Sequence, residues 1–112
     1  MNFLEKKKKQ REAKKMKKNI REIRRYINRI EREIHRMEIG EKKTMAQLKT
    51  AMNKRDDSST RTIAKQITTA RKDRAQLNNT KLYLGNIMNK LQTMQATVNT
   101  SEVLENVSKN LK

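Results

Sequence analysis

The sequence of 112 residues has no proline, no cysteine and no tryptophan, and only two glycines. Because proline and glycine are the residues that break helices, long helices can form without interruption. The absence of cysteine excludes disulfides, thiol catalysis and zinc–cysteine sites, and it fits a reducing compartment. Aromatic residues make up 3% and apolar residues 33% of the chain. This is little for a globular core but typical of a helical hairpin or coiled coil, which buries seams.

Long hydrophobic runs are also missing. No stretch approaches the ~20 apolar residues that a membrane-spanning helix needs. Residues 1–5 lack the apolar region of a secretory signal. We therefore expect a cytoplasmic protein that is soluble or peripheral to a membrane rather than integral.

Acidic residues are scarce relative to basic ones, and the net charge is +17. The excess is uneven, because residues 1–55 contain 20 Lys or Arg and 7 Asp or Glu, whereas residues 56–112 contain 9 and 5. A compact state with this charge repels itself unless something anionic is nearby. The composition thus predicts an anionic partner: nucleic acid, an anionic membrane or an acidic protein segment.

Two rows of residues repeat with an alternating step of three and four in the first part of the chain. Residues at this spacing share one face of an α-helix. The apolar seam consists of Met16, Ile20, Ile23, Ile27, Ile30, Ile34 and Met37. The cationic stripe consists of Lys7, Arg11, Lys14, Lys18, Arg21, Arg25, Arg29, Arg32 and Arg36. Lys14 and Met16 lie about 200° apart around a helix axis, so the seam and the stripe occupy opposite sides of one helix.

This first helix is expected over residues 5–53, with its seam resuming at Leu48 and Met52. Residues 53–59 are polar and rich in capping residues, so they predict a short link with Asp57, Ser58 or Ser59 as the next N-cap. A second amphipathic helix follows over residues 59–98. A short link between two such helices implies an antiparallel hairpin, and the fold class predicted is all-α.

Arg74 and Lys81 fall at seam positions of the second helix. Because an unpaired buried charge is costly, we expect their charged groups to reach water or to pair with Glu41 or Glu38 across the hairpin.

Both ends of the chain carry smaller features. Residues 1–4 form an apolar tip, with Phe3 and Leu4 ahead of the lysine block, Lys6 to Lys9. The tip is either a frayed terminus or a small membrane anchor backed by lysines. Residues 97–101 are expected to form a hinge, with Thr100 or Ser101 as N-cap, before a third amphipathic helix begins over residues 101–112.

Catalytic or cofactor chemistry has no support in the sequence. His35 is the only histidine and has no cysteine or triad partner, so we expect it on the solvated surface. No glycine-rich phosphate loop and no metal-ligand spacing are present. We therefore predict a protein that is not an enzyme and needs no cofactor or metal.

An anionic membrane is the partner that the pattern favours. Single-stranded nucleic acids usually require aromatic stacking platforms, which are few here, whereas a membrane requires only a line of cations and a small anchor. The residues predicted to bind membrane are Phe3, Leu4, Lys6, Lys7, Lys8, Lys9, Arg11, Lys14, Lys15, Lys18, Arg21, Arg25, Arg29, Arg32 and Arg36. A basic helical hairpin that binds RNA remains the alternative.

The chain resembles the ESCRT-III family, the charged multivesicular body proteins. Residues 21–56 are similar to the family's first helix, with Glu41-Lys42-Lys43 at mid-helix. Residues 61–96 are similar to its second helix, with Ile63-Ala64-Lys65 and Arg71-Lys72, and residues 100–112 resemble the start of its third helix. Among its branches the chain looks most like the late-acting subunits.

The resemblance implies a subunit that polymerises, with itself or with homologous subunits, into filaments that bend and sever endosomal or other anionic membranes. It also implies a basic core that lacks the family's acidic C-terminal half. In that case self-inhibition and recruitment of an AAA ATPase are not expected from this chain.

Overall fold

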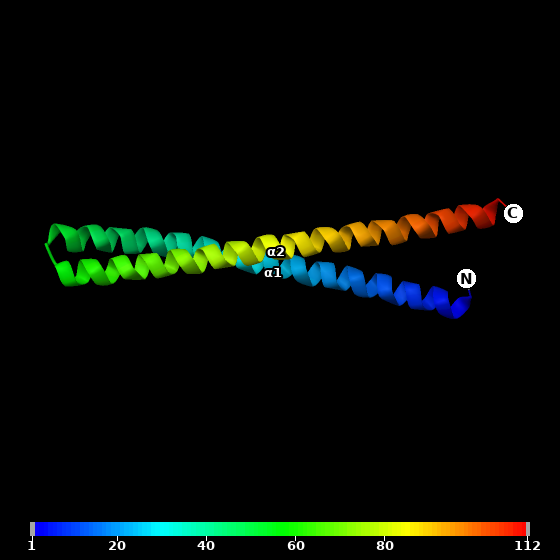
Figure 1. Ribbon diagram of the computed structural model, residues 1–112, viewed down its shortest axis with the longest axis horizontal. Helices are drawn as coiled ribbons and strands as arrows, with labels where there is room; N and C mark the ends of the chain where they lie inside the picture. Colours follow the sequence, from blue (N-terminus) through cyan, green and yellow to red (C-terminus); the bar gives the residue numbers. More distant parts are fainter. Residues whose placement is uncertain (1, 112) are drawn as a thin grey trace. The chain divides into compact units, whose positions relative to one another are not determined.

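The protein is described here by a computed structural model that covers residues 2–111. Within these residues it consists of two helices, α1 (Phe3–Asn53) and α2 (Asp57–Asn110). The helices run antiparallel on either side of a short link (Figure 1). The expected all-α hairpin is thus confirmed. The chain divides into a link unit, residues 27–83, and a terminal unit, residues 2–26 and 84–111.

The link unit contains most of the buried apolar side chains. Ile30 and Ile34 of α1, Ala51 at the end of α1 and Ile67 of α2 are all buried. Ile27 and Met37 are half-buried on the same face of α1, as the predicted seam requires. Gly40 does not interrupt α1, because its backbone is helical and a single helical glycine costs only about 1 kcal/mol.

The link itself is a compact helix terminator. The backbone N–H of Arg55 donates to the Met52 carbonyl at 3.0 Å, and that of Asp56 donates to the Ala51 carbonyl at 3.0 Å. This pair of bonds is the Schellman motif, which needs a left-handed residue after the helix. Arg55 takes that conformation, with φ of 56°, although glycine is the residue that adopts it without strain.

Asp56 begins α2 as its N-cap. Its carboxylate accepts a hydrogen bond from the backbone N–H of Ser59 at 3.1 Å and another from the Ser59 hydroxyl at 2.8 Å. The prediction that Asp57, Ser58 or Ser59 would cap α2 was therefore wrong. The Schellman motif ends at Asp56, so the helix starts earlier than the run of serines suggested.

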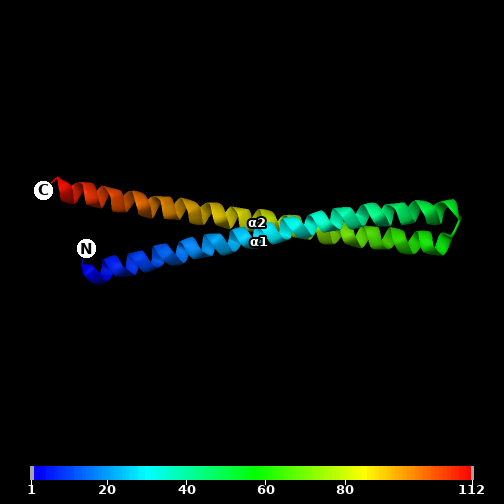
Figure 2. The same cartoon turned by 180° about the vertical axis from the view of Figure 1, so that it is seen from behind.

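The terminal unit is packed less tightly than the link unit. Ile20 is its buried apolar residue, at 5% exposed, among the residues described. Met16 and Ile23 of α1 and Leu84, Leu91 and Val98 of α2 are half-buried. Within this unit the two helices draw apart toward the chain ends (Figure 1 and Figure 2). All seven seam positions of α1 therefore face α2, as predicted, but the packing weakens toward the termini.

Two expectations from the sequence are wrong, the place of Met52 in the seam and the hinge at residues 97–101. Met52 is exposed and the neighbouring Ala51 is buried instead, because the short link brings the helices close and a small residue fits there. Residues 97–101 form no hinge, since α2 continues through them to Asn110. Thr97 and Thr100 cap nothing; their hydroxyls donate to the carbonyls of Thr93 and Ala96, one helical turn back. The expected third helix is therefore the last part of α2, and residues 1 and 112 lie outside the described residues.

Candidate membrane interface

The cationic stripe is fully displayed on α1 in the terminal unit. Its six members there are all exposed and, among the residues described, none forms an ion pair. They are Lys7, Arg11, Lys14, Lys18, Arg21 and Arg25. The placement follows from the seam: because the apolar side of α1 faces α2, the opposite side faces solvent.

Most helical neighbours of the stripe are also basic, and Glu22 is the acidic residue within one turn of Lys18 and Arg25. Side chains three and four residues apart are the ones that can pair on a helix. Around Arg21 these four positions hold Lys17, Lys18, Arg24 and Arg25. Like charges at this spacing destabilise a helix by a few tenths of a kcal/mol each. The arrangement therefore favours an external anion.

The stripe continues on α1 within the link unit at Arg29, Arg32 and Arg36, all exposed. Arg36 lies 3.7 Å from Glu33, one turn away, in a solvent-exposed ion pair. Such surface pairs are worth little and are easily exchanged for another anion. All nine stripe positions are thus exposed, as expected.

Phe3 and Leu4 of the apolar tip form the first turn of α1. Asn2 caps the helix, since its side-chain oxygen accepts a hydrogen bond from the Glu5 backbone N–H at 2.8 Å. Phe3 and Leu4 are 69% and 75% exposed in the first turn. The ammonium group of Lys7 lies 4.7 Å from the centre of the Phe3 ring. The tip thus presents two apolar side chains next to the lysine block.

An ion-pair cluster interrupts the apolar seam in the link unit. The Glu41 carboxylate of α1 pairs with both Arg71 and Arg74 of α2. Hydrogen bonding to Arg71 lowers the pKa of Glu41 below its ordinary value; Arg74 adds to this, and partial burial opposes it. The expected partner for Arg74 is therefore confirmed, whereas Arg71 was not anticipated. Lys81, the other charged seam residue, is half-buried.

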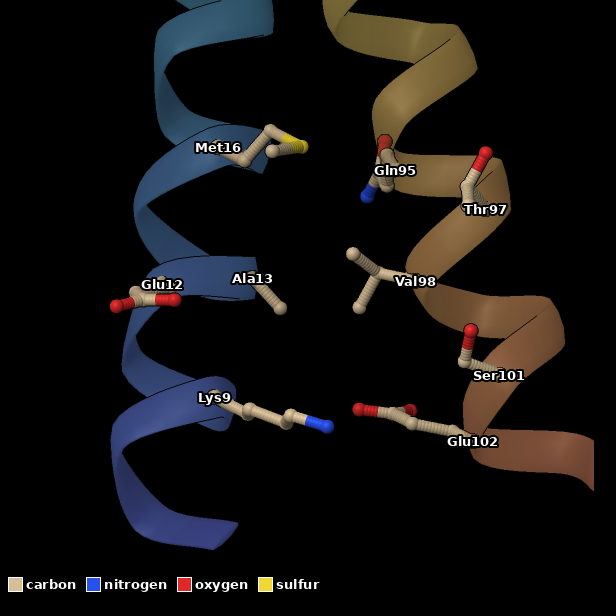
Figure 3. Close-up of a pocket in the computed structure, with 9 residues that line it drawn as sticks. All are labelled: Lys9, Glu12, Ala13, Met16, Gln95, Thr97, Val98, Ser101 and Glu102. Carbon is tan, nitrogen blue, oxygen red and sulfur yellow. The ribbon is translucent and has the colours of Figure 1, made fainter. Parts of the chain in front are cut away.

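Two hollows in the terminal unit were also not anticipated. One, of about 210 Å³, lies between Ala13 and Met16 of α1 and Val98 of α2, with Lys9 facing Glu102 at its edge (Figure 3). The other, of about 250 Å³, is polar and is lined by Lys6, Lys9, Gln10, Glu102, Glu105 and Asn106. The divergence of the helices opens both, which helical periodicity alone does not indicate.

The part of the chain that the structure describes contains no cluster of possible metal ligands. No three His, Cys, Asp or Glu side chains gather there as metal ligands would. His35 is exposed on α1, where the sequence analysis placed it. Among residues 2–111, neither helix has a stretch long and apolar enough to cross a membrane.

Comparison with known proteins gives one match. The model of the Snf7 family matches residues 18–112, which is most of the chain and both helices. The apolar tip and the lysine block lie ahead of the matched residues. No curated protein and no solved structure matches the chain. Proteins of the Snf7 family are structural subunits of membrane-remodelling polymers and not enzymes. The chain therefore belongs to the Snf7 family, the ESCRT-III proteins.

Proposed function

We propose that this ESCRT-III protein binds anionic membranes through the exposed side of α1 and remodels them as a filament subunit. The observation that carries the proposal is the row of exposed basic side chains from Lys7 to Arg25 in the terminal unit, none of which forms an ion pair among the residues described. Each cation near an anionic leaflet contributes about 1 kcal/mol, so several acting together suffice for stable peripheral binding.

The apolar tip has a supporting role in this proposal. Phe3 and Leu4 are exposed beside the lysine block, so they can enter the headgroup region while the lysines meet phosphates. Burying two apolar side chains contributes a few kcal/mol at most. The tip therefore assists binding that the cations dominate. It lies ahead of the residues that the family model matches.

The partners in this proposal are anionic lipids, further copies of the chain and homologous subunits, on endosomal or other cytoplasmic membrane surfaces. Assignment to the late-acting branch of the family is also part of the proposal. It is tested by electron microscopy of the protein mixed with early- and late-acting subunits, where filament formation with the late-acting subunits alone is expected. The family match gives no support to the RNA-binding alternative.

The deciding experiment is co-sedimentation with liposomes of phosphatidylcholine alone and with added phosphatidylserine. We expect binding only to the phosphatidylserine liposomes, and weaker binding as salt rises. Replacing Lys14, Lys18, Arg21 and Arg25 by Glu should abolish it. The matched control replaces four exposed basic residues of α2, Arg61, Lys65, Lys72 and Lys90, by Glu and should retain most of it.

Circular dichroism must show unchanged helicity in both variants. Equal binding to neutral liposomes at physiological salt, or equal loss in the control, would refute the assignment to α1. Preferential, salt-resistant binding to RNA over phosphatidylserine liposomes would favour the nucleic-acid alternative instead.

A further inference from the structure

The link between the two helices depends on one strained residue. α1 ends at Asn53 and α2 begins at Asp57, so residues 54–56 reverse the direction of the chain. Arg55 makes the reversal with a φ of 56°, a left-handed conformation that is unfavourable for a residue with a Cβ atom. Glycine is the usual residue at such a place, because it adopts this conformation without strain. The turn therefore lacks the residue that would make it favourable.

The residues of the link are compatible with a continuous helix. Residues 53–59 contain neither proline nor glycine, and both Lys54 and Arg55 are good helix formers. If Arg55 takes the helical conformation, α1 runs directly into α2 and the backbone groups of the link join the helical hydrogen bonds. The contact that opposes this change is the cap, in which Asp56 accepts two hydrogen bonds from Ser59. The link thus has two accessible states, one reversed and one helical.

The contacts of the link unit do not require that both helices come from one chain. Ile34 of α1 and Ile67 of α2 are buried in the seam. Glu41 of α1 pairs across the seam with Arg71 and Arg74 of α2. When the link is helical, α1 and α2 of one chain extend in line and cannot cover each other. Two such chains placed antiparallel restore these contacts between α1 of one copy and α2 of the other.

We propose that two copies of this chain exchange their α1 helices and form an antiparallel, domain-swapped dimer in which both links are helical. Short links under strain favour such an exchange. The occupant of the seam is a second copy, because α1 and its Glu41 are already complementary to α2 of the same sequence. The cationic stripes of both copies stay exposed, since each stripe lies opposite the seam. The inference does not depend on the proposed membrane binding.

Charge repulsion opposes the association of two copies. Each chain carries a net charge of +17, and like charges on two chains repel each other. Salt screens this repulsion, over a length of about 10 Å at 0.1 M. The exchanged seam is mostly apolar, so salt does not weaken it. We therefore expect the dimer fraction to rise with both protein and salt concentration.

The first experiment detects the exchange directly. The chain has no cysteine, so spin labels can be attached at Asn28→Cys and Asn78→Cys, exposed positions of the link unit on α1 and α2. The labelled protein is unfolded and refolded at high salt and high protein concentration, alone or with a tenfold excess of unlabelled protein. The dimer is then isolated by size-exclusion chromatography, and the distance between labels is measured by electron spin resonance.

The two states predict different distances in the diluted sample. In a hairpin the labels lie on neighbouring helices of one chain, whose axes are about 10 Å apart, and unlabelled protein does not alter the short distance. In the exchanged dimer the labels of one chain lie on one continuous helix, about 75 Å apart at 1.5 Å per residue. We expect dilution to replace the short distance by the long one. A short distance that survives dilution, or the absence of any dimer, would overturn the proposal.

The second experiment changes the link. Arg55→Gly permits the left-handed turn and disfavours the helical link by about fivefold relative to alanine. Because a dimer contains two links, the association constant measured by sedimentation should fall by about 25-fold or more. The matched control, Arg55→Ala, removes the same charge but keeps a Cβ atom, and its association constant should stay within about threefold of the wild-type value. Circular dichroism must show wild-type helicity in both variants.

Each remaining outcome of the sedimentation experiment contradicts the exchange. Equal losses in Arg55→Gly and Arg55→Ala would mean that the charge of Arg55, and not the conformation of the link, controls association. A dimer fraction that falls as salt rises would mean that charge pairs between intact hairpins hold the copies together. Neither experiment contains liposomes, so a failure of the proposed membrane binding leaves both results unchanged.

Discussion

Glu41 of α1 and Arg74 of α2 form an ion pair across the hairpin, inside a seam that is mostly apolar. The Glu41 side chain is only 14% exposed and that of Arg74 27%. Arg71 joins from the adjacent turn of α2. A charged pair inside an apolar seam is satisfied in one alignment of the helices and left unpaired in any other. We therefore expect the cluster to specify how α1 and α2 align within the link unit.

The first prediction concerns this pair. Removing one partner leaves the other charge half-buried without compensation, so Glu41→Leu and Arg74→Met should each lower the melting temperature. The double variant should lose less than the sum of the two, because neither charge is then stranded. Thermal unfolding of the wild type, the two single variants and the double variant, followed by circular dichroism, gives the four melting temperatures of this double-mutant cycle. Additive losses would mean that the pair does not act as a unit.

The second prediction is a loss of stability in acid. Hydrogen bonds from Ser59 lower the pKa of Asp56, and hydrogen bonding to Arg71 lowers that of Glu41. A carboxylate with a lowered pKa stabilises the fold above its ordinary pKa, and this is lost as pH falls through the folded-state pKa. The ordinary pKa values are 4.5 for Glu41 and 3.8 for Asp56. As the pH falls below these values, the melting temperature should therefore decrease.

The variant Asp56→Asn separates these contributions. Asparagine also caps helices well but does not titrate, so this variant should show a shallower decline in melting temperature between pH 4 and pH 2. A decline as steep as in the wild type would show that Asp56 has no part in the acid sensitivity.

The third prediction uses the backbone of the link. Arg55 adopts a left-handed conformation, which is strained for a residue with a Cβ atom. Replacement by glycine removes this strain but makes the unfolded chain more flexible. We expect Arg55→Gly to raise the free energy of unfolding by about 0.5–1 kcal/mol. Urea denaturation measures this free energy of unfolding. The control Arg55→Val introduces a β-branched residue, and it should lower the free energy of unfolding.

The fourth prediction compares two isoleucines of α1. Ile34 is buried at 8% exposed, whereas Ile39, little more than one turn further, is 46% exposed. Ile34→Ala should lower the free energy of unfolding by about 2–4 kcal/mol, because it removes packed methyl groups and leaves a cavity. Ile39→Ala should change it by less than about 1 kcal/mol. Similar losses in both variants would contradict the assignment of the seam.

The sequence by itself determined the helices and the two sides of α1. Seven apolar and nine basic positions at helical spacing place the seam from Met16 to Met37 and the stripe opposite it. Nothing except the 3.6-residue period of the helix is needed for this. For Arg74 the sequence offered solvent, Glu38 or Glu41 as alternatives, because an unpaired buried charge is costly, and the structure selects Glu41.

Only the tertiary structure decided where α2 ends, which residue caps it, and how closely its last turns approach α1. Thr100 or Ser101 was expected to cap a third helix, but both lie inside α2, and the Thr100 hydroxyl bonds backward to the Ala96 carbonyl. The side of α2 that carries Glu102 and Glu105 is defined by contact with α1. Helix propensity does not contain this information, because the divergence of two helices depends on side chains far apart in sequence that meet only in the folded chain.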